Sequence, residues 1–265
     1  MAIGYARPVW QYRAFIRTAI TNELRGRFAR SKIGGLWFLL NPLATAAIYA
    51  LVLSKLLGAR LGGVDDPAAY PVYLIAGLAG WTLFFEITNR CLTIFMEYAG
   101  ALKKIAFPRI ALPIIVLGNA LVNQAFLLVA VGLIATLLGY PVGLAWIALP
   151  LLTAVAAMLG FGLGILLGLM NVFVRDVGQV VAVVLQLAFW LTPIVYPLSI
   201  LPEQVAQVVQ ANPVTPIVQG YQDIVVFERF PDLSSLLVPV LVGGALLLAS
   251  VFVFRRAAPE LVDAL

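Results

Sequence analysis

Residues 171–225 read NVFVRDVGQVVAVVLQLAFWLTPIVYPLSILPEQVAQVVQANPVTPIVQGYQDIV, and the order of parts in this stretch decides the fold. A short polar turn, where we expect an ion pair between Arg175 and Asp176, leads into the apolar run 177–196. The half-polar segment that follows is interrupted by prolines and never regains the roughly 20 apolar residues that cross a membrane. Irregular backbone near a membrane must be buried in protein or line a wet cavity. We therefore expect a span followed by a re-entrant pair of short helices.

The rest of the chain is equally apolar. Of its 265 residues, 63% are hydrophobic and 11% are charged, whereas a soluble domain is about half apolar and a quarter charged. Not one charged residue lies between Ile110 and Val174. This composition predicts an all-α polytopic membrane protein. We expect six spans, at residues 36–57, 72–95, 110–138, 144–170, 177–196 and 236–254.

The basic residues predict an orientation. Thirteen of the 17 lysines and arginines precede the first span, lie between spans two and three or four and five, or follow span six. The positive-inside rule then places both termini in the cytoplasm. We expect one membrane domain over residues 1–265, made of a cytoplasmic interface helix (1–35), a six-helix region (36–256) and a cytoplasmic tail (257–265). Because the basic residues flank spans, they indicate topology rather than nucleic-acid binding.

An amphipathic helix is predicted before the first span. Its apolar face comprises Tyr12, Phe15, Ile16, Ala19 and Ile20. Arg13, Arg17, Thr21 and Arg25 fall away from that face. Such a helix lies on the inner membrane surface with its arginines towards anionic headgroups. The alternative is a basic flank that only sets topology.

Two stretches resemble one family. The run LRGRFARSKIGGLWFLLNPL, residues 24–43, resembles the basic run, small-residue turn and Asn-Pro start of the first helix in ABC-2-type polysaccharide exporter permeases. Residues 171–225 look like the fifth helix and re-entrant loop of that family, and NPVTPIVQGYQDIV, residues 212–225, matches closely. The resemblance covers nearly the whole chain. It implies the membrane subunit of an O-antigen exporter, with teichoic acid, capsule or a small hydrophobic compound as alternative cargo.

The resemblance also implies partners. The chain has no G-x-x-x-x-G-K-[ST] run, so we expect no cofactor on it and no ATP hydrolysis. ATP and Mg would bind two separate nucleotide-binding ATPase subunits. Two copies of this chain would form a channel that is embedded in the lipid of the bacterial inner membrane. An undecaprenyl-linked polysaccharide would pass through it. With no histidine and one cysteine, we expect neither a catalytic nor a metal site.

The loop MEYAGALKKIAFP, residues 96–108, is short and amphipathic. In ABC exporters such a segment is the coupling helix that sits in a cleft of the ATPase. We assign ATPase coupling to Glu97, Tyr98, Lys103 and Lys104, with an ordinary basic loop as the alternative.

A conduit for sugar chains suits aromatic rings that stack on sugar faces without gripping particular hydroxyls. The predicted lining comprises Trp37, Phe38 and Tyr49 on the first span and Phe189, Trp190 and Tyr196 on the fifth. An interfacial aromatic belt is the alternative. The predicted outer gate comprises Asn212, Pro213, Tyr221 and Gln222. Tyr221 and Gln222 either touch the sugar or pack the loop.

Two features inside the spans leave alternatives open. Glu86 and Arg90 lie four apart on one helix face and can satisfy each other, whereas a lone charge in the membrane costs roughly 3 kcal/mol. Gly160, Gly164 and Gly168 suit close helix packing, within the subunit or across a dimer. A passive channel and a membrane-embedded transferase are alternatives of a different class; the transferase would need acidic metal ligands or bases.

Overall fold

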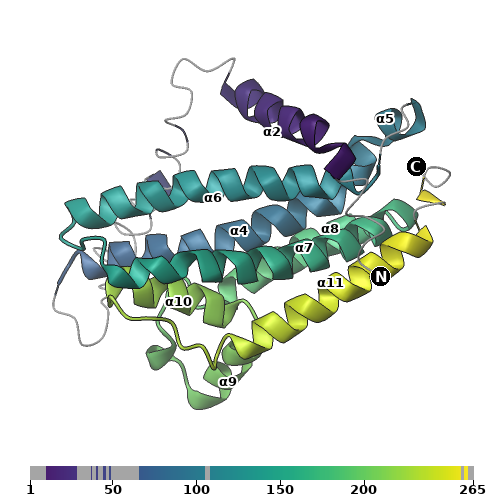
Figure 1. Cartoon of the computed structure of the whole chain (residues 1–265). Coiled ribbons are helices and arrows are strands. Elements are labelled where there is room, and N and C mark those ends of the chain that lie inside the picture. Colours follow the sequence, from purple (N-terminus) through teal and green to yellow (C-terminus); the bar gives the residue numbers. More distant parts are fainter. Residues whose placement is uncertain are drawn as a thin grey trace.

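The computed structural model describes residues 10–28, 66–104, 108–257, 260 and 261, and the isolated positions 37, 40, 44, 45 and 48. Every regular element among these residues is a helix (Figure 1). This confirms the all-helical prediction for the described part of the chain. Apart from the five isolated positions, the predicted first span lies outside the described residues, and Phe38 and Tyr49 lie outside them too.

Four described helices are long and apolar enough to cross a membrane, judged by length and composition. They are α4 (Ala69–Glu97), α6 (Ala111–Leu137), the continuous stretch Leu144–Phe173 and α11 (Leu237–Ala257). The third of these joins a short 3-10 turn, η3 (Leu144–Ala148), to α7 (Leu149–Phe173). These helices match the second, third, fourth and sixth predicted spans.

The predicted fifth span is shorter than expected. Helix α8 (Asp176–Trp190) has 15 residues, which at 1.5 Å each reach only about 22 Å. Pro193 disfavours helical backbone at Thr192, and residues 191–197 are irregular. The helix of the predicted fifth span therefore ends at Trp190, six residues before the predicted boundary.

Helix α4 is the most buried of the four long helices, and α7 packs along it. Three glycines of α7 face α4: a Cβ at Gly160 would lie 3.0 Å from the Phe84 carbonyl oxygen, and one at Gly168 would lie 2.2 Å from that of Cys91. Gly164 faces α4 as well. The glycine seam is therefore used within the subunit, which answers a question that the sequence left open.

The elements divide between two ends of the bundle (Figure 1). Helix α5 (Ala99–Lys104), the start of α6, the turn between α7 and α8, and the end of α11 lie at one end. The start of α4 and the turn between α6 and α7 lie at the other. The described loops and ends that carry the predicted cytoplasmic charges thus share one end.

Two short helices follow residues 191–197 where the sequence predicted a re-entrant pair, but they differ in burial. Helix α9 (Glu203–Ala211) is amphipathic and mostly exposed. Helix α10 (Thr215–Val226) packs against α4 and α7 and buries most of its residues.

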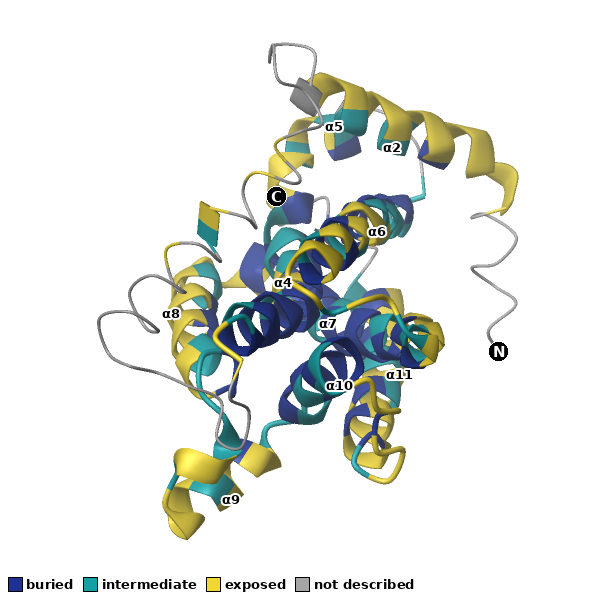
Figure 2. Cartoon of the chain, turned by 90° about the vertical axis from the view of Figure 1, so that its left-hand side faces the viewer, coloured by how far each residue is buried: buried dark blue, intermediate teal, exposed yellow. Residues whose placement is uncertain are grey.

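Helix α2 (Arg13–Phe28) lies across the bundle above α6, on which it packs (Figure 2). Ile16 is buried, whereas Arg13, Arg17 and Arg25 are exposed. Of the predicted apolar face, Ile16, Ala19 and Ile20 pack on α6, whereas Tyr12 and Phe15 are exposed.

Candidate functional site

The irregular segment 191–197 is held in place by side chains from two other helices. The Tyr70 hydroxyl on α4 donates to the Val195 carbonyl oxygen at 2.7 Å, and the Tyr73 hydroxyl donates to that of Tyr196 at 3.3 Å. From α10, Gln222 Nε2 donates to the Pro193 carbonyl oxygen at 3.0 Å. Because an irregular backbone lacks the internal hydrogen bonds of a helix, these three donors supply partners to carbonyl groups in the segment that follows α8.

The turn between α9 and α10 is tied to the same segment. Asn212 Nδ2 donates to Thr192 Oγ1 at 3.0 Å, and Asn212 Oδ1 accepts from the Val214 N–H at 3.0 Å. Asn212 and Pro213 are both partly buried. These two predicted gate residues therefore lie in the turn between α9 and α10, which Asn212 ties to Thr192 just after the end of α8.

Tyr221 is fully buried on α10. Its hydroxyl accepts from Gln124 Nε2 of α6 at 3.1 Å and shares a hydrogen bond of 2.8 Å with Thr153 Oγ1 of α7. Gly80 of α4 allows this approach, since a Cβ there would lie 2.9 Å from the Tyr221 ring. Gln222 is also buried. For these two side chains the geometry favours the packing role over contact with sugar.

An aromatic cluster surrounds the end of α8. The Phe189 ring meets Trp81 of α4 edge-on at 5.8 Å and meets Trp190 at 5.4 Å. Phe189 is partly buried, whereas Trp190 is 54% exposed. The Tyr196 hydroxyl donates to the Trp190 carbonyl oxygen at 2.7 Å, which fixes the chain after the cluster.

Trp81 is the member of this cluster that sequence reasoning missed. A signal was present, because Phe84 and Phe85 follow Trp81 at helical spacing on α4, and both of their rings contact that of Trp81. Trp37, from the predicted first span, is 48% exposed. The structure therefore brings together the fifth-span half of the predicted aromatic lining, while Phe38 and Tyr49 lie outside its description.

The predicted coupling segment, residues 96–108, begins at the end of α4 and contains α5. Leu102 is buried against the bundle, whereas Tyr98 and Lys103 are exposed and Glu97 accepts a hydrogen bond of 2.5 Å from Thr93 Oγ1. The side chain of Lys104 lies outside the described part. The segment thus has an anchored apolar side and a polar side that is open to a partner.

The turn between α7 and α8 is pinned by Asn171. Its Nδ2 donates to the Leu92 carbonyl oxygen of α4 at 3.0 Å, and its Oδ1 accepts from the Gly178 N–H at 2.9 Å. Arg175 and Asp176 are both exposed, and the ion pairs of the described residues do not include one between them. The predicted pair is wrong because the adjacent residues stand at the start of α8, where Asp176 favourably faces the helix dipole.

The charges inside the bundle also differ from expectation. Arg90 Nη1 is 3.9 Å from Glu86 Oε1, but Arg90 Nη2 hydrogen-bonds Glu23 of α2. Asn119 and Asn123 of α6 donate to Glu23 and Glu86, at 2.5 Å and 2.6 Å. The predicted mutual satisfaction of Glu86 and Arg90 is therefore incomplete, because the closer acid comes from α2.

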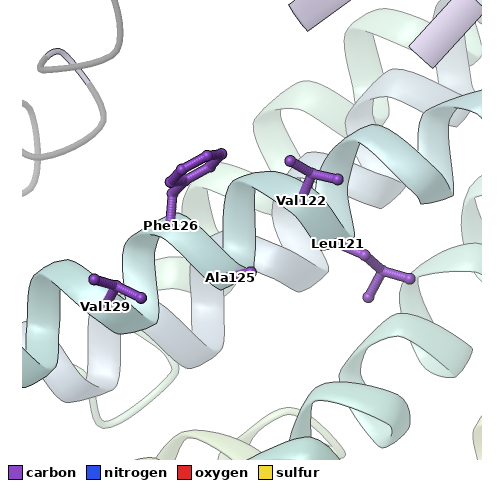
Figure 3. A pocket seen from close by; sticks show the side chains of 5 residues that line it. All are labelled: Leu121, Val122, Ala125, Phe126 and Val129. Atoms are coloured by element: carbon purple, nitrogen blue, oxygen red, sulfur yellow. The ribbon is translucent and has the colours of Figure 1, made fainter. Parts of the chain in front are cut away.

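Helix α6 carries a shallow apolar hollow on its outward face (Figure 3). It is lined by Leu121, Val122, Ala125, Phe126 and Val129. This lining has no polar side chain to orient a sugar, and it suits the hydrocarbon of a bilayer. Among the described residues, no group of three or more Cys, Asp or Glu side chains is placed to hold a metal ion.

The comparisons with known proteins agree with this architecture. The ABC-2 type transporter family matches residues 15–226, and the chain belongs to that family. It is an integral membrane protein with several membrane-spanning helices.

Three relatives extend along much or all of the chain. An O-antigen export system permease protein of Myxococcus xanthus is 26% identical over 267 residues, covering 99% of this chain and 100% of the relative. Another from Klebsiella pneumoniae is 29% identical and covers 77% of this chain and 78% of the relative. A polysialic acid transport protein of Escherichia coli is 23% identical with the same coverage.

Proposed function

We propose that this chain is the membrane subunit of an ATP-driven ABC exporter that moves an undecaprenyl-linked surface polysaccharide of O-antigen type across the bacterial inner membrane. The observation that carries the proposal is the end-to-end similarity to an O-antigen export permease, 26% identical over 99% of this chain. The family match over residues 15–226 supports the exporter class.

The proposed subunit is one membrane domain with both termini in the cytoplasm. Its six crossings are the predicted first span, α4, α6, α7, α11, and α8 continued by the irregular segment 191–197. Helices α9 and α10 would form the outer gate. The gathering of the described basic loops at one end of the bundle supports this orientation.

Two copies of the chain are proposed to form the channel. Helix α8 supports this, because only Val181 and Leu185 of its residues are buried in a single chain. Its exposed apolar residues are Val180, Val183, Val184, Leu187 and Trp190. This face, which includes the outer part of the aromatic cluster, is free to meet a second copy and the passing glycan.

The glycan would slide over many weak aromatic contacts instead of one tight site. Trp190 is the side chain best placed for this role, because it is half exposed and its ring packs edge-on against that of Phe189. Tyr196 is expected to add a further aromatic contact to the glycan. Trp37, Phe38 and Tyr49 would line the path from the first span.

Energy would come from two separate ATPase subunits that bind ATP and Mg, while this chain hydrolyses nothing. The end of α4 and the following α5 would be the contact, through Glu97, Tyr98, Lys103 and Lys104. Their exposed polar side supports this role.

The first test is co-purification with the candidate nucleotide-binding subunit. We expect a stable complex whose ATPase rate depends on this chain, and we expect its loss when Glu97, Lys103 and Lys104 are reversed in charge. The matched control is Glu203→Lys on α9, an exposed acid outside the coupling segment. If the chain purifies alone and no ATPase associates, the exporter proposal fails and a passive channel becomes the leading account.

The cargo is tested by deleting the gene in its own host. We expect the surface polysaccharide to disappear and a lipid-linked glycan to accumulate on the cytoplasmic side of the membrane. A capsular chain is the second candidate, because a polysialic acid transport protein is also similar to this chain. Chemical analysis of the accumulated glycan separates the two, and unchanged surface glycans would refute both.

A further inference from the structure

Helix α2 docks on the first turns of α6 through an apolar contact. Ile16 is buried in a cluster with Ala111 and Ile115 of α6. One turn later, Ile20 lies against Gly118, where an added Cβ would meet the isoleucine Cδ1 at 2.4 Å. Glu23 follows on the same face of α2, at the position where a third apolar residue would continue the stripe.

Glu23 binds two different helices at once. Arg90 of α4 donates to its Oε1, and Asn119 of α6 donates to its Oε2 at 2.5 Å. Hydrogen bonds to ionised groups are about twice as strong as neutral ones. The carboxylate therefore sets where α2 sits along α4 and α6, which apolar contact alone specifies poorly.

A second acid, Glu86, lies close to the guanidinium of Arg90. Glu86 lies one turn before Arg90 on α4, with its Oε1 3.9 Å from Arg90 Nη1. That distance is too long for a hydrogen bond, and Nη1 is buried without a hydrogen-bond partner among the described residues. Asn123 donates a hydrogen bond of 2.6 Å to the Glu86 carboxylate and helps to fix its position beside Arg90.

Two amide oxygens of this network also accept no hydrogen bond from the described residues. The Oδ1 atoms of Asn119 and Asn123 are buried without hydrogen-bond partners within the described part of the chain. A partly satisfied polar network is less rigid than a complete one. Removing one partner of an ion pair inside a protein leaves the other charge alone. The Arg90–Glu23 pair is partly buried, and Glu86 would prevent that outcome for Arg90.

We propose that Arg90 is a two-position switch for the docking of α2. With α2 docked, the guanidinium binds Glu23; with α2 released, it turns to Glu86 on its own helix. The two acids compete for one base, so Glu86 weakens the hold on α2 while Glu23 creates it. This inference concerns the position of α2 and does not depend on which molecule is transported.

The switch predicts opposite effects for two isosteric substitutions in one cluster. Glu23→Gln removes the charged partner on α2 and should release the helix. Glu86→Gln removes the competitor and the repulsion between the two carboxylates, and should hold α2 more tightly. If the network only packed the helices together, both substitutions would loosen it.

The test follows the accessibility of position 16, which is buried only while α2 is docked. The full-length protein in detergent would carry Cys91→Ala, which removes its single cysteine, and Ile16→Cys as the probe. The rate of modification by N-ethylmaleimide reports release of α2. We expect Glu23→Gln to raise this rate about tenfold and Glu86→Gln to lower it several-fold.

The matched control is Asp176→Asn, an exposed acid at the start of α8 that takes no part in this cluster. Its rate should equal that of the parent. The exchange Glu23→Arg with Arg90→Glu should restore slow modification, because the ion pair is rebuilt in reverse. An unchanged rate in Glu23→Gln, or an unchanged or raised rate in Glu86→Gln, would overturn the switch.

Discussion

Gly168 of α7 lies so close to Cys91 of α4 that a Cβ at position 168 would stand 2.2 Å from the Cys91 carbonyl oxygen. The atom in the way belongs to the backbone of a buried helix, which cannot turn aside as a side chain can. In lipid, helices are held together by such close packing because apolar surface gains little from leaving the bilayer hydrocarbon. The contact explains why this face of α7 is glycine.

Gly168→Ala is therefore expected to destabilise the protein by at least the usual cost of overpacking, about 1–3 kcal/mol. Thermal unfolding in detergent measures the effect. Gly244→Ala on α11 is the matched control, since nothing lies within 4 Å of the added Cβ, and it should be neutral or slightly stabilising because alanine favours helix. Equal losses in both variants would mean that the contact with Cys91 is not the cause.

Tyr221→Phe removes a hydroxyl that serves two helices. Gln124 and Thr153 would each lose a buried hydrogen bond, and an unmade buried bond costs about 1–3 kcal/mol. We expect a lower unfolding temperature, with α10 loosened first in hydrogen exchange. Tyr98→Phe is the control, because Tyr98 is 41% exposed on the surface. If both variants unfold alike, Tyr221 does not hold α10 through its hydroxyl.

Trp190→Ala is expected to reduce surface glycan without loss of folding or of ATPase binding. The side chain is half exposed, so its removal leaves little cavity, while Phe189 keeps its contact with Trp81. Trp190→Phe should retain most export, because a ring that can stack on sugar remains. Normal glycan in the alanine variant would exclude a role in the path, and loss of the protein from the membrane would show a packing role instead.

The end of the bundle where α4 begins carries a pH-sensitive contact. The Ala68 N–H and the Tyr140 hydroxyl donate to Asp66, and in that order they lower its pKa below the ordinary 3.8. Burial, and then Asp66, raises the pKa of Tyr140 to about 12, so its hydroxyl stays protonated at neutral pH.

Because folding lowers the pKa of Asp66, the ionised carboxylate stabilises the fold above about pH 4, and this contribution disappears as the pH falls through the folded-state pKa. Tyr140→Phe should therefore lower the unfolding temperature at pH 7 more than at pH 3. The size of the difference is small, since Asp66 is exposed. A loss that is the same at both pH values would show that the hydroxyl does not act through the carboxylate.

The sequence predicted the features that depend on local pattern. Apolar runs predicted α4, α6, α7 and α11, and the face of α2 that packs on α6 was visible in the spacing of Ile16 and Ile20. The loop at residues 96–108 contains the expected short helix, α5. The sequence also contains Pro193, which disfavours helix before it. Because the apolar run continues to Tyr196, the span was predicted to end there, and the earlier end of α8 was missed.

The sequence by itself determined that this chain is an all-helical membrane protein, because composition and periodicity are properties of neighbouring residues. The tertiary structure alone decided which partners the polar and glycine residues take. Arg90 pairs with Glu23, 67 positions away, and Gln124 with Tyr221, 97 positions away. Such contacts depend on how helices cross in space. A buried polar group hydrogen-bonds to whichever partner the packing brings near. The spacing of residues along one helix does not indicate which partner that is.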